Sequence, residues 1–154
     1  MSGGTRSYEM ARRLVDMGHE VHMITSWRGD HHTSDWFITN EDGIIVHWFP
    51  VAYSNSFSNL KRILAFLKFS VAATRRCWSL SVDLVFATST PLTIAIPGYL
   101  IAKRMSIPMV FEVRDLWPTL PIAIGSLKNP LLRWLAFKLE RFAYFNSKQV
   151  IALS

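Results

Sequence analysis

The sequence MVFEVRDLWP, residues 109–118, carries the clearest structural signal in the chain. It begins with apolar residues that only Glu112 interrupts, and it continues into the charged residues Arg114 and Asp115. A short apolar run with little alternation is typical of a strand buried in a parallel sheet. In open α/β sheets the ligand crevice lies beyond the carboxyl ends of such strands. We therefore place Arg114 and Asp115 at a ligand-binding edge, or, alternatively, in an ion pair that ties down a loop.

Strand-like and helix-like segments alternate on both sides of this stretch. Such alternation predicts a parallel sheet wrapped by helices. The long segment 27–41 is polar and is predicted as a loop, followed by a turn at Asp42 and Gly43. A helix that begins near Pro91 is expected to kink at Pro97. The other expected strands are 20–26, 44–49, 83–88 and 149–153, and the other expected helices end near Gly18 or span 59–78 and 130–145.

Composition limits the class of protein. The chain has 154 residues, half of them hydrophobic, which suits one domain with its own core. The formal net charge of +6 favours anionic partners such as nucleic acid, sugar nucleotides or an acidic membrane surface. Cys77 is the only cysteine, so no internal disulfide forms. No signal peptide or membrane-spanning run is visible, and we expect a cytoplasmic protein, peripheral at most to the inner face of the membrane.

Gly3 and Gly4 lead straight into the first predicted helix. Backbone N–H groups at a helix start form an anion site, although a Gly-Gly pair is also common in ordinary turns. Arg6 in the first turn opposes the helix dipole unless an anion binds there. In a doubly wound fold such a glycine turn follows the first strand, and no strand precedes this one. We therefore expect a Rossmann-like doubly wound sheet that lacks its first strand, in a domain spanning 1–154 and truncated at both ends.

The predicted helix 59–78 carries a basic arc. At 100° per residue its cations fall within about 140° of the helix surface, and Phe69 lies among them. This arc is either an ordinary solvated face or a surface that faces acidic lipid. An apolar stripe of Leu60, Leu64, Leu67, Val71 and Trp78 lies opposite and is expected to face the sheet. The basic arc consists of Lys61, Arg62, Lys68, Arg75 and Arg76.

Other sites and classes receive less support from the sequence. The loop residues Asp30, His31, His32 and Asp35 lack a rigid surrounding shell, so we expect no metal and no cofactor. The pattern G-x-G-x-x-G is absent, which disfavours a dinucleotide-dependent oxidoreductase. No nucleic-acid recognition motif appears. The last helix places aromatic residues between basic ones, which suits contact with a membrane, a partner or another part of the protein.

Four segments together support a resemblance to a known family. GGTRSYEMARRLVDMGHEVHMIT, STPLT, MVFEVRDLWP and VIALS resemble the amino-terminal half of family-four glycosyltransferases, which are retaining, metal-independent enzymes of the GT-B fold. Within that family the chain is similar to bacterial O-antigen and capsule transferases of the N-acetyl-fucosamine type. The resemblance covers nearly the whole chain.

The resemblance implies a function and a set of roles. Such enzymes have two Rossmann-like domains, of which the amino-terminal one mainly holds the acceptor and the other holds the nucleotide-sugar donor. It implies catalytic roles for Arg114 and Asp115, although many relatives carry His-Asp at this position. The expected reaction is sugar transfer to a glycan or lipid-linked acceptor in cell-surface polysaccharide synthesis. The implied substrate-binding residues are Gly3, Gly4, Thr5, Arg6, Ser89 and Thr90.

An alternative function follows from the same resemblance. No donor-binding domain with paired glutamates is present, so the isolated chain is expected to be inactive in sugar transfer. The chain is then either one half of a glycosyltransferase or an inactive fragment that acts only as a membrane- or partner-binding module. The basic arc of the helix 59–78 is the expected membrane-facing surface in both cases.

Overall fold

The computed structural model describes residues 6–27, 35–51, 57, 59–89 and 91–153. The chain divides into two compact units, Met1–Ala73 and Thr74–Ser154, and helix α2 (Asn59–Cys77) crosses the boundary between them. Several residues singled out in the sequence lie outside the described part: Gly3, Gly4, Thr5, Asp30, His31, His32 and Thr90.

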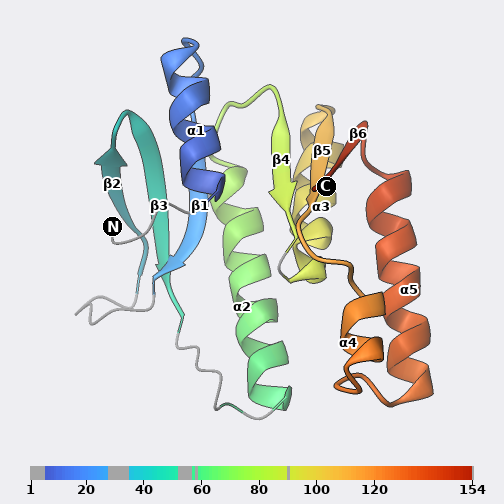
Figure 1. The fold of residues 1–154 in the computed structure, drawn as a ribbon. Coiled ribbons are helices and arrows are strands. Elements are labelled where there is room, and N and C mark those ends of the chain that lie inside the picture. The colour runs from blue at the N-terminus through green and yellow to red at the C-terminus, as the bar shows by residue number, and fades with distance from the viewer. Residues whose placement is uncertain (1–5, 28–34, 52–56, 58, 90, 154) are drawn as a thin grey trace. The chain divides into compact units, whose positions relative to one another are not determined.

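The first unit contains a three-stranded mixed sheet in its described part, in the order β1-β3-β2 (Figure 1). Strands β1 (His22–Trp27) and β3 (Ile44–Pro50) run parallel, and β2 (Phe37–Glu41) pairs antiparallel with β3. Helix α1 (Arg6–Asp16) buries Ala11 in a cluster with side chains of β3. This arrangement makes β3 the central, most buried strand of the unit.

The loop predicted for residues 27–41 was wrong for Phe37–Glu41, which form strand β2. The turn at Asp42 and Gly43 is confirmed, with φ of 50° and 82°, the left-handed values that a tight two-residue hairpin needs. A Cβ added at Gly43 would lie 2.7 Å from Cγ1 of Val15, so glycine also leaves room for α1. The residues before the turn therefore pair with β3 as a hairpin, because alternate side chains of β2 are half-buried.

Helix α2 packs differently from the sequence prediction. Phe69, expected within the basic arc, packs against the buried cluster of Phe49, Val51 and Ala65. Small side chains such as Ala65 let this side of the helix pack closely against the end of β3, where Phe49 lies. The stripe expected to face the sheet is exposed instead at Leu64, Leu67, Val71 and Trp78, so that prediction was wrong.

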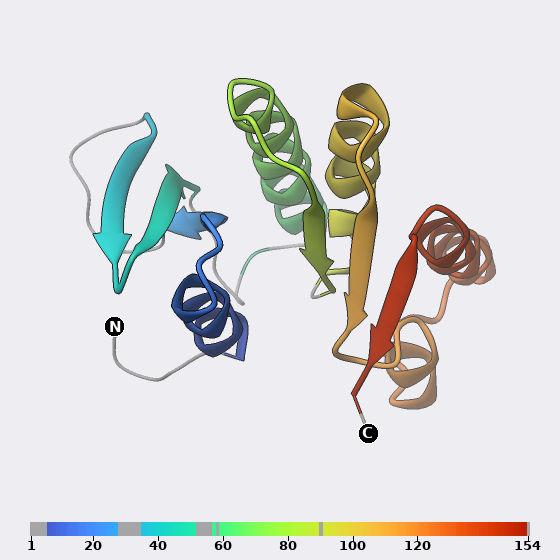
Figure 2. The same cartoon turned by 90° about the horizontal axis from the view of Figure 1, so that it is seen from above.

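The second unit is a parallel sheet with helices, in the order β4-β5-β6 (Figures 1 and 2). This parallel arrangement confirms the predicted α/β, Rossmann-like class. None of the helices in the described part of the chain is long and apolar enough to cross a bilayer. The elements are β4 (Val85–Thr88), the 3₁₀ turn η1 (Leu92–Ile94), α3 (Ala95–Met105), β5 (Met109–Val113), α4 (Thr119–Ala123), α5 (Pro130–Phe145) and β6 (Gln149–Ala152).

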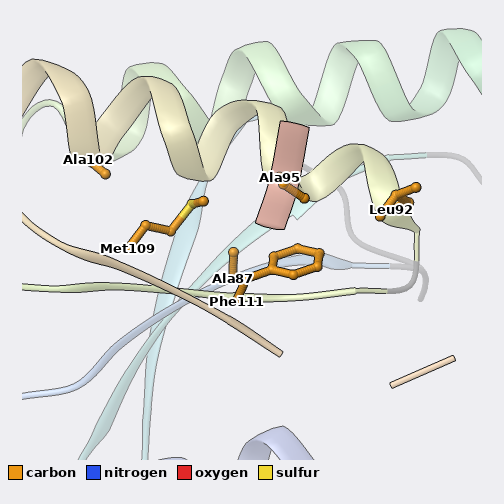
Figure 3. Close-up of a cluster of buried hydrophobic side chains, with 7 residues drawn as sticks. Ala87, Leu92, Ala95, Ala102, Met109 and Phe111 are labelled. Carbon is orange, nitrogen blue, oxygen red and sulfur yellow. The ribbon is translucent and has the colours of Figure 1, made fainter. Parts of the chain in front are cut away.

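The core of this unit lies between the sheet and α3. Figure 3 shows Met109 and Phe111 pointing from β5 toward the alanines of α3. A Cβ added at Gly98 would lie 3.0 Å from the Met109 sulfur and 3.1 Å from Cβ of Ala87, so glycine permits this close approach. Pro97 lies in the first turn of α3, after η1, where its missing N–H interrupts little of the helix. The single helix expected from Pro91 is thus a 3₁₀ turn followed by α3.

Candidate functional site

The carboxyl ends of β4 and β5 form a polar edge on the second unit's sheet. The strands run parallel and pair Thr88 with Glu112, so both end at the same edge. Ser89 follows β4 directly, and Arg114 follows β5. Ligand crevices in α/β folds lie at such edges. We call these residues, together with Asp115, the strand-end site.

Ser89 joins the two strand ends. It is only 3% exposed, and its backbone N–H donates to the carbonyl oxygen of Glu112 at 2.8 Å. Its hydroxyl oxygen accepts a hydrogen bond from the backbone N–H of Arg114 at 2.9 Å. The point at which Arg114 leaves β5 is therefore held by a buried side chain from the neighbouring strand.

Glu112 is fully buried near the carboxyl end of β5. The hydroxyl of Thr88 donates to its Oε2 at 2.8 Å. A buried carboxyl group without hydrogen bonds costs several kcal/mol, on the order of 2–7, so such bonds matter for the strand pair. Sequence reasoning missed both residues. The signal was the one acidic residue in an otherwise apolar strand, since Glu is rarely fully buried without a partner.

Arg114 and Asp115 are exposed at the end of β5. Within the described part of the chain, no ion pair engages the guanidinium of Arg114. The loop that follows is anchored, because the N–H of Trp117 donates to the Asp115 carbonyl at 2.7 Å and Pro118 is buried. The ion-pair alternative is therefore disfavoured for Arg114, and its planar fork is open to a ligand.

Comparison with protein-family models assigns the chain to a family. The sequence model of the glycosyl transferase 4-like domain matches residues 3–154, which include the whole strand-end site. The chain belongs to this family. A search of curated protein sequences finds no match. Members of a glycosyltransferase family act on a sugar donor and an acceptor. Membership in this family therefore indicates an enzyme of the glycosyltransferase type in general.

The predicted site residues of this glycosyl transferase 4-like domain do not all lie in one part of the chain. Ser89, Arg114 and Asp115 come together at the strand-end site, whereas Arg6 is exposed at the start of α1 in the first unit. Gly3, Gly4, Thr5 and Thr90 lie outside the described residues.

The basic arc of α2 is largely exposed. Lys61, Lys68 and Arg75 are exposed, and Arg76 is half-buried. The ammonium nitrogen of Lys68 lies 5.7 Å from the ring centroid of Phe49, close enough for a cation–π contact. The side chain of Arg62 lies outside the description. The arc therefore keeps most of its predicted cations at the surface, without Phe69.

A second polar cluster lies on the first unit's sheet. His47, 2% exposed in β3, contacts His22 of β1 with 2.9 Å between Nε2 and Nδ1. The other nitrogen of His22 lies 2.8 Å from a carboxylate oxygen of Glu20. Among the described residues, no group of three or more His, Cys, Asp or Glu side chains is placed to hold a metal ion. The His22–His47 contact links β1 to β3 through their side chains.

Proposed function

We propose that this domain is the acceptor-side half of a retaining GT-B glycosyltransferase. It transfers a sugar from a nucleotide-sugar donor to a lipid-linked glycan acceptor in the synthesis of cell-surface polysaccharide. Family membership supports glycosyl transfer in general. The likeness of its RDLWP and STPLT segments to O-antigen and capsule transferases of the N-acetyl-fucosamine type supports the narrower assignment.

The strand-end site carries this proposal. Arg114 presents an exposed guanidinium on backbone that Ser89 fixes. In the reaction negative charge develops on the leaving diphosphate, and fixed donors stabilise such charge when no metal does so. A guanidinium is suited to two oxygens at once, either of a diphosphate or of adjacent sugar hydroxyls. Arg114 therefore contacts donor or sugar, and Asp115 lies beside the reacting sugar.

The family resemblance implies substrate-binding roles for further residues of each unit. The resemblance assigns Gly3, Gly4 and Thr5 to the donor pyrophosphate, for which backbone N–H groups are suited, and it assigns the exposed cation of Arg6 to the substrate as well. Ser89 acts through Arg114, because its hydroxyl is already engaged with the Arg114 backbone. Thr90, next in the chain, is assigned to substrate binding by the resemblance alone.

Sugar transfer from a panel of nucleotide sugars tests the proposal. The intact protein is incubated with radiolabelled uridine-, guanosine- and thymidine-linked sugars and with lipid-linked acceptors extracted from bacterial membranes. We expect labelled product with one donor class, and loss of that product in Arg114→Ala. Arg104→Ala removes an exposed arginine elsewhere in the same unit and should keep activity. The absence of product with every donor, together with no donor binding by calorimetry, would refute the proposal.

A second candidate function is a membrane-binding module without transfer activity. It is favoured by α2, where Lys61, Lys68 and Arg75 are exposed together with Leu64 and Leu67. Sedimentation with vesicles that contain or lack anionic lipid tests it. With all five cations of the basic arc changed to Gln, each lost charge should weaken binding by about 1 kcal/mol. This contribution of each charge should be smaller at high salt. Equal binding by wild type and variant would remove this surface from consideration.

A further inference from the structure

The outward side of α5 is aromatic and basic rather than polar. The inward side packs Leu139, Ala143 and Tyr144 into the core of the second unit. At 100° per residue the side chains opposite to Leu139 and Ala143 fall within an arc of about 120°, and Tyr144 lies beside that arc. Figure 2 shows α5 beside β6, with the rest of the sheet on one side of it only. We call this arc the α5 outer face: Leu131, Trp134, Phe137, Lys138, Arg141 and Phe145, all of them exposed.

An outer face of this kind is not a normal solvated surface. Surface helices usually place charged and polar residues opposite their apolar stripe. On α5 the exposed fraction reaches 75% for Phe145 and 62% for Leu131, and Trp134 is also more than half exposed. A contiguous exposed patch of large apolar side chains marks an interaction surface.

The charges on this face have one sign. The ammonium nitrogen of Lys138 lies 5.5 Å from the ring centroid of Trp134, and the guanidinium of Arg141 lies 5.2 Å from that of Phe145. Glu140 is the acidic residue of α5, and it lies outside the arc, where its carboxylate accepts a hydrogen bond from the Tyr144 hydroxyl at 3.0 Å. The outer face therefore presents two aromatic–cation pairs and no carboxylate.

We propose that the α5 outer face docks on the surface of an anionic phospholipid bilayer, with the helix lying parallel to the membrane plane. Helices that bind this way combine Trp, Phe and Leu at the headgroup boundary with Lys and Arg that reach lipid phosphates. At 16 residues α5 spans about 24 Å, which suits a helix lying on the membrane rather than crossing it.

Protein partners fit the α5 outer face less well. A two-fold contact centred on this face would bring Lys138 and Arg141 of both chains into one interface, with no acid among them. Buried protein interfaces are also depleted of lysine. A lipid surface instead offers phosphates to the cations and acyl chains to the rings. The inference is independent of sugar transfer and of the basic arc of α2.

Vesicle flotation with matched charge variants tests the proposal. The intact protein is mixed with vesicles of phosphatidylcholine alone, or of phosphatidylcholine with phosphatidylglycerol. The test variant carries Lys138→Gln and Arg141→Gln. The control carries Lys103→Gln and Arg104→Gln, which removes two similar aromatic–cation pairs whose cations lie on α3. Both variants lower the formal net charge from +6 to +4.

The expected result separates a local effect of α5 from overall charge. Each basic residue near an anionic surface strengthens partition about fivefold, so the test variant should bind about thirtyfold more weakly to the mixed vesicles. The control should change partition by less than about fivefold, because its cations do not face the membrane. Trp134→Ser with Phe145→Ser keeps the net charge and should also weaken binding, since it removes the rings that enter the headgroup boundary.

Several outcomes would overturn the proposal. They are equal binding by the test and control charge variants, undiminished binding by the aromatic variant, and equal binding to both vesicle types. A wild type that binds no vesicles but forms oligomers that the aromatic variant disrupts would show a protein partner instead. Thermal unfolding of each variant confirms its fold, and Phe145→Ser alone, at the most exposed ring of the face, preserves the test if the double variant unfolds.

Discussion

The hydroxyl of Ser89 accepts a hydrogen bond from the backbone N–H of Arg114 across 2.9 Å. This bond joins residues 25 positions apart in the sequence, at the ends of two adjacent parallel strands. It determines where the chain turns away from β5, and hence where the Arg114 side chain starts. A buried hydroxyl on one strand thus sets the position of an exposed cation on the next.

Ser89→Ala should destabilise the domain. It removes the acceptor of a buried backbone N–H, which costs on the order of 1–3 kcal/mol in the free energy of unfolding. Urea denaturation followed by circular dichroism measures this change. Ser126→Ala is the matched control, because the Ser126 hydroxyl also bonds to backbone but is exposed, and about 0.5 kcal/mol or less is expected there. Equal losses in the two variants would contradict the structural role of Ser89.

Thr88 and Glu112 should behave as a coupled pair. Thr88→Val leaves the buried Glu112 carboxyl without one of its donors, which should cost about 1–3 kcal/mol. Glu112→Leu removes the acceptor, and the double variant leaves neither group of the pair. We expect the double variant to be more stable than the sum of the two single losses predicts, with a coupling of about 0.5–3 kcal/mol by urea denaturation. Strict additivity would show that the 2.8 Å contact does not act as a unit.

Local chemistry made part of this structure predictable from sequence. Gly18 was expected to end the first helix, and it follows α1 with φ of 89°. The last helix was expected to begin at residue 130, and the Asn129 side chain caps it there by accepting hydrogen bonds from the N–H groups of Leu131 and Leu132. The apolar run of β5 was also placed correctly. These features depend on a few neighbouring residues, so one sequence contains their cause.

Features that depend on distant contacts were missed. Strand β2 has no continuous apolar run, since its last three residues are Thr39, Asn40 and Glu41, and it forms because the Asp42–Gly43 turn brings β3 alongside it. Leu64 and Leu67 follow a helical stripe, yet α2 packs through Ala65 and Phe69. Periodicity reports that a helix has an apolar side, but the strand that it meets decides which side is buried. The Thr88–Glu112 contact depends on the register of two strands, which sequence spacing does not contain.

Cys77 should react slowly in the native protein. Burial raises the pKa of its thiol from 9.0 to about 11, and the nearby Arg76 lowers it by less than burial raises it. Because the thiolate is the reacting form, alkylation at about pH 8 should be about 100-fold slower than in the urea-unfolded chain. The rate should rise about tenfold per pH unit until the pH approaches the raised pKa. Iodoacetamide labelling followed by mass spectrometry measures it.

The same raised pKa links Cys77 to stability at high pH. Folding holds the thiol protonated, so this stabilisation is complete below the unfolded pKa near 9 and is lost as the pH rises through about 11. Cys77→Ala should flatten that part of the pH profile of urea denaturation. A native alkylation rate that levels off near pH 9, as in the unfolded chain, would mean that the thiol is not buried.

Arg114 should affect turnover without affecting stability. It is exposed at the end of β5 and, among the described residues, forms no ion pair, so Arg114→Ala and Arg114→Lys should each change the free energy of unfolding by about 0.5 kcal/mol or less. Charge-assisted hydrogen bonds contribute about 1.5–3 kcal/mol, so loss of the guanidinium should slow sugar transfer about 10- to 100-fold. Lysine keeps the charge but not the planar fork, and it should restore only part of the rate if both nitrogens bind one ligand. Arg104→Ala, assayed with the same nucleotide sugar, is the control. Full activity in Arg114→Ala would exclude Arg114 from the site. A loss of activity matched by a loss of stability would assign Arg114 a structural role instead.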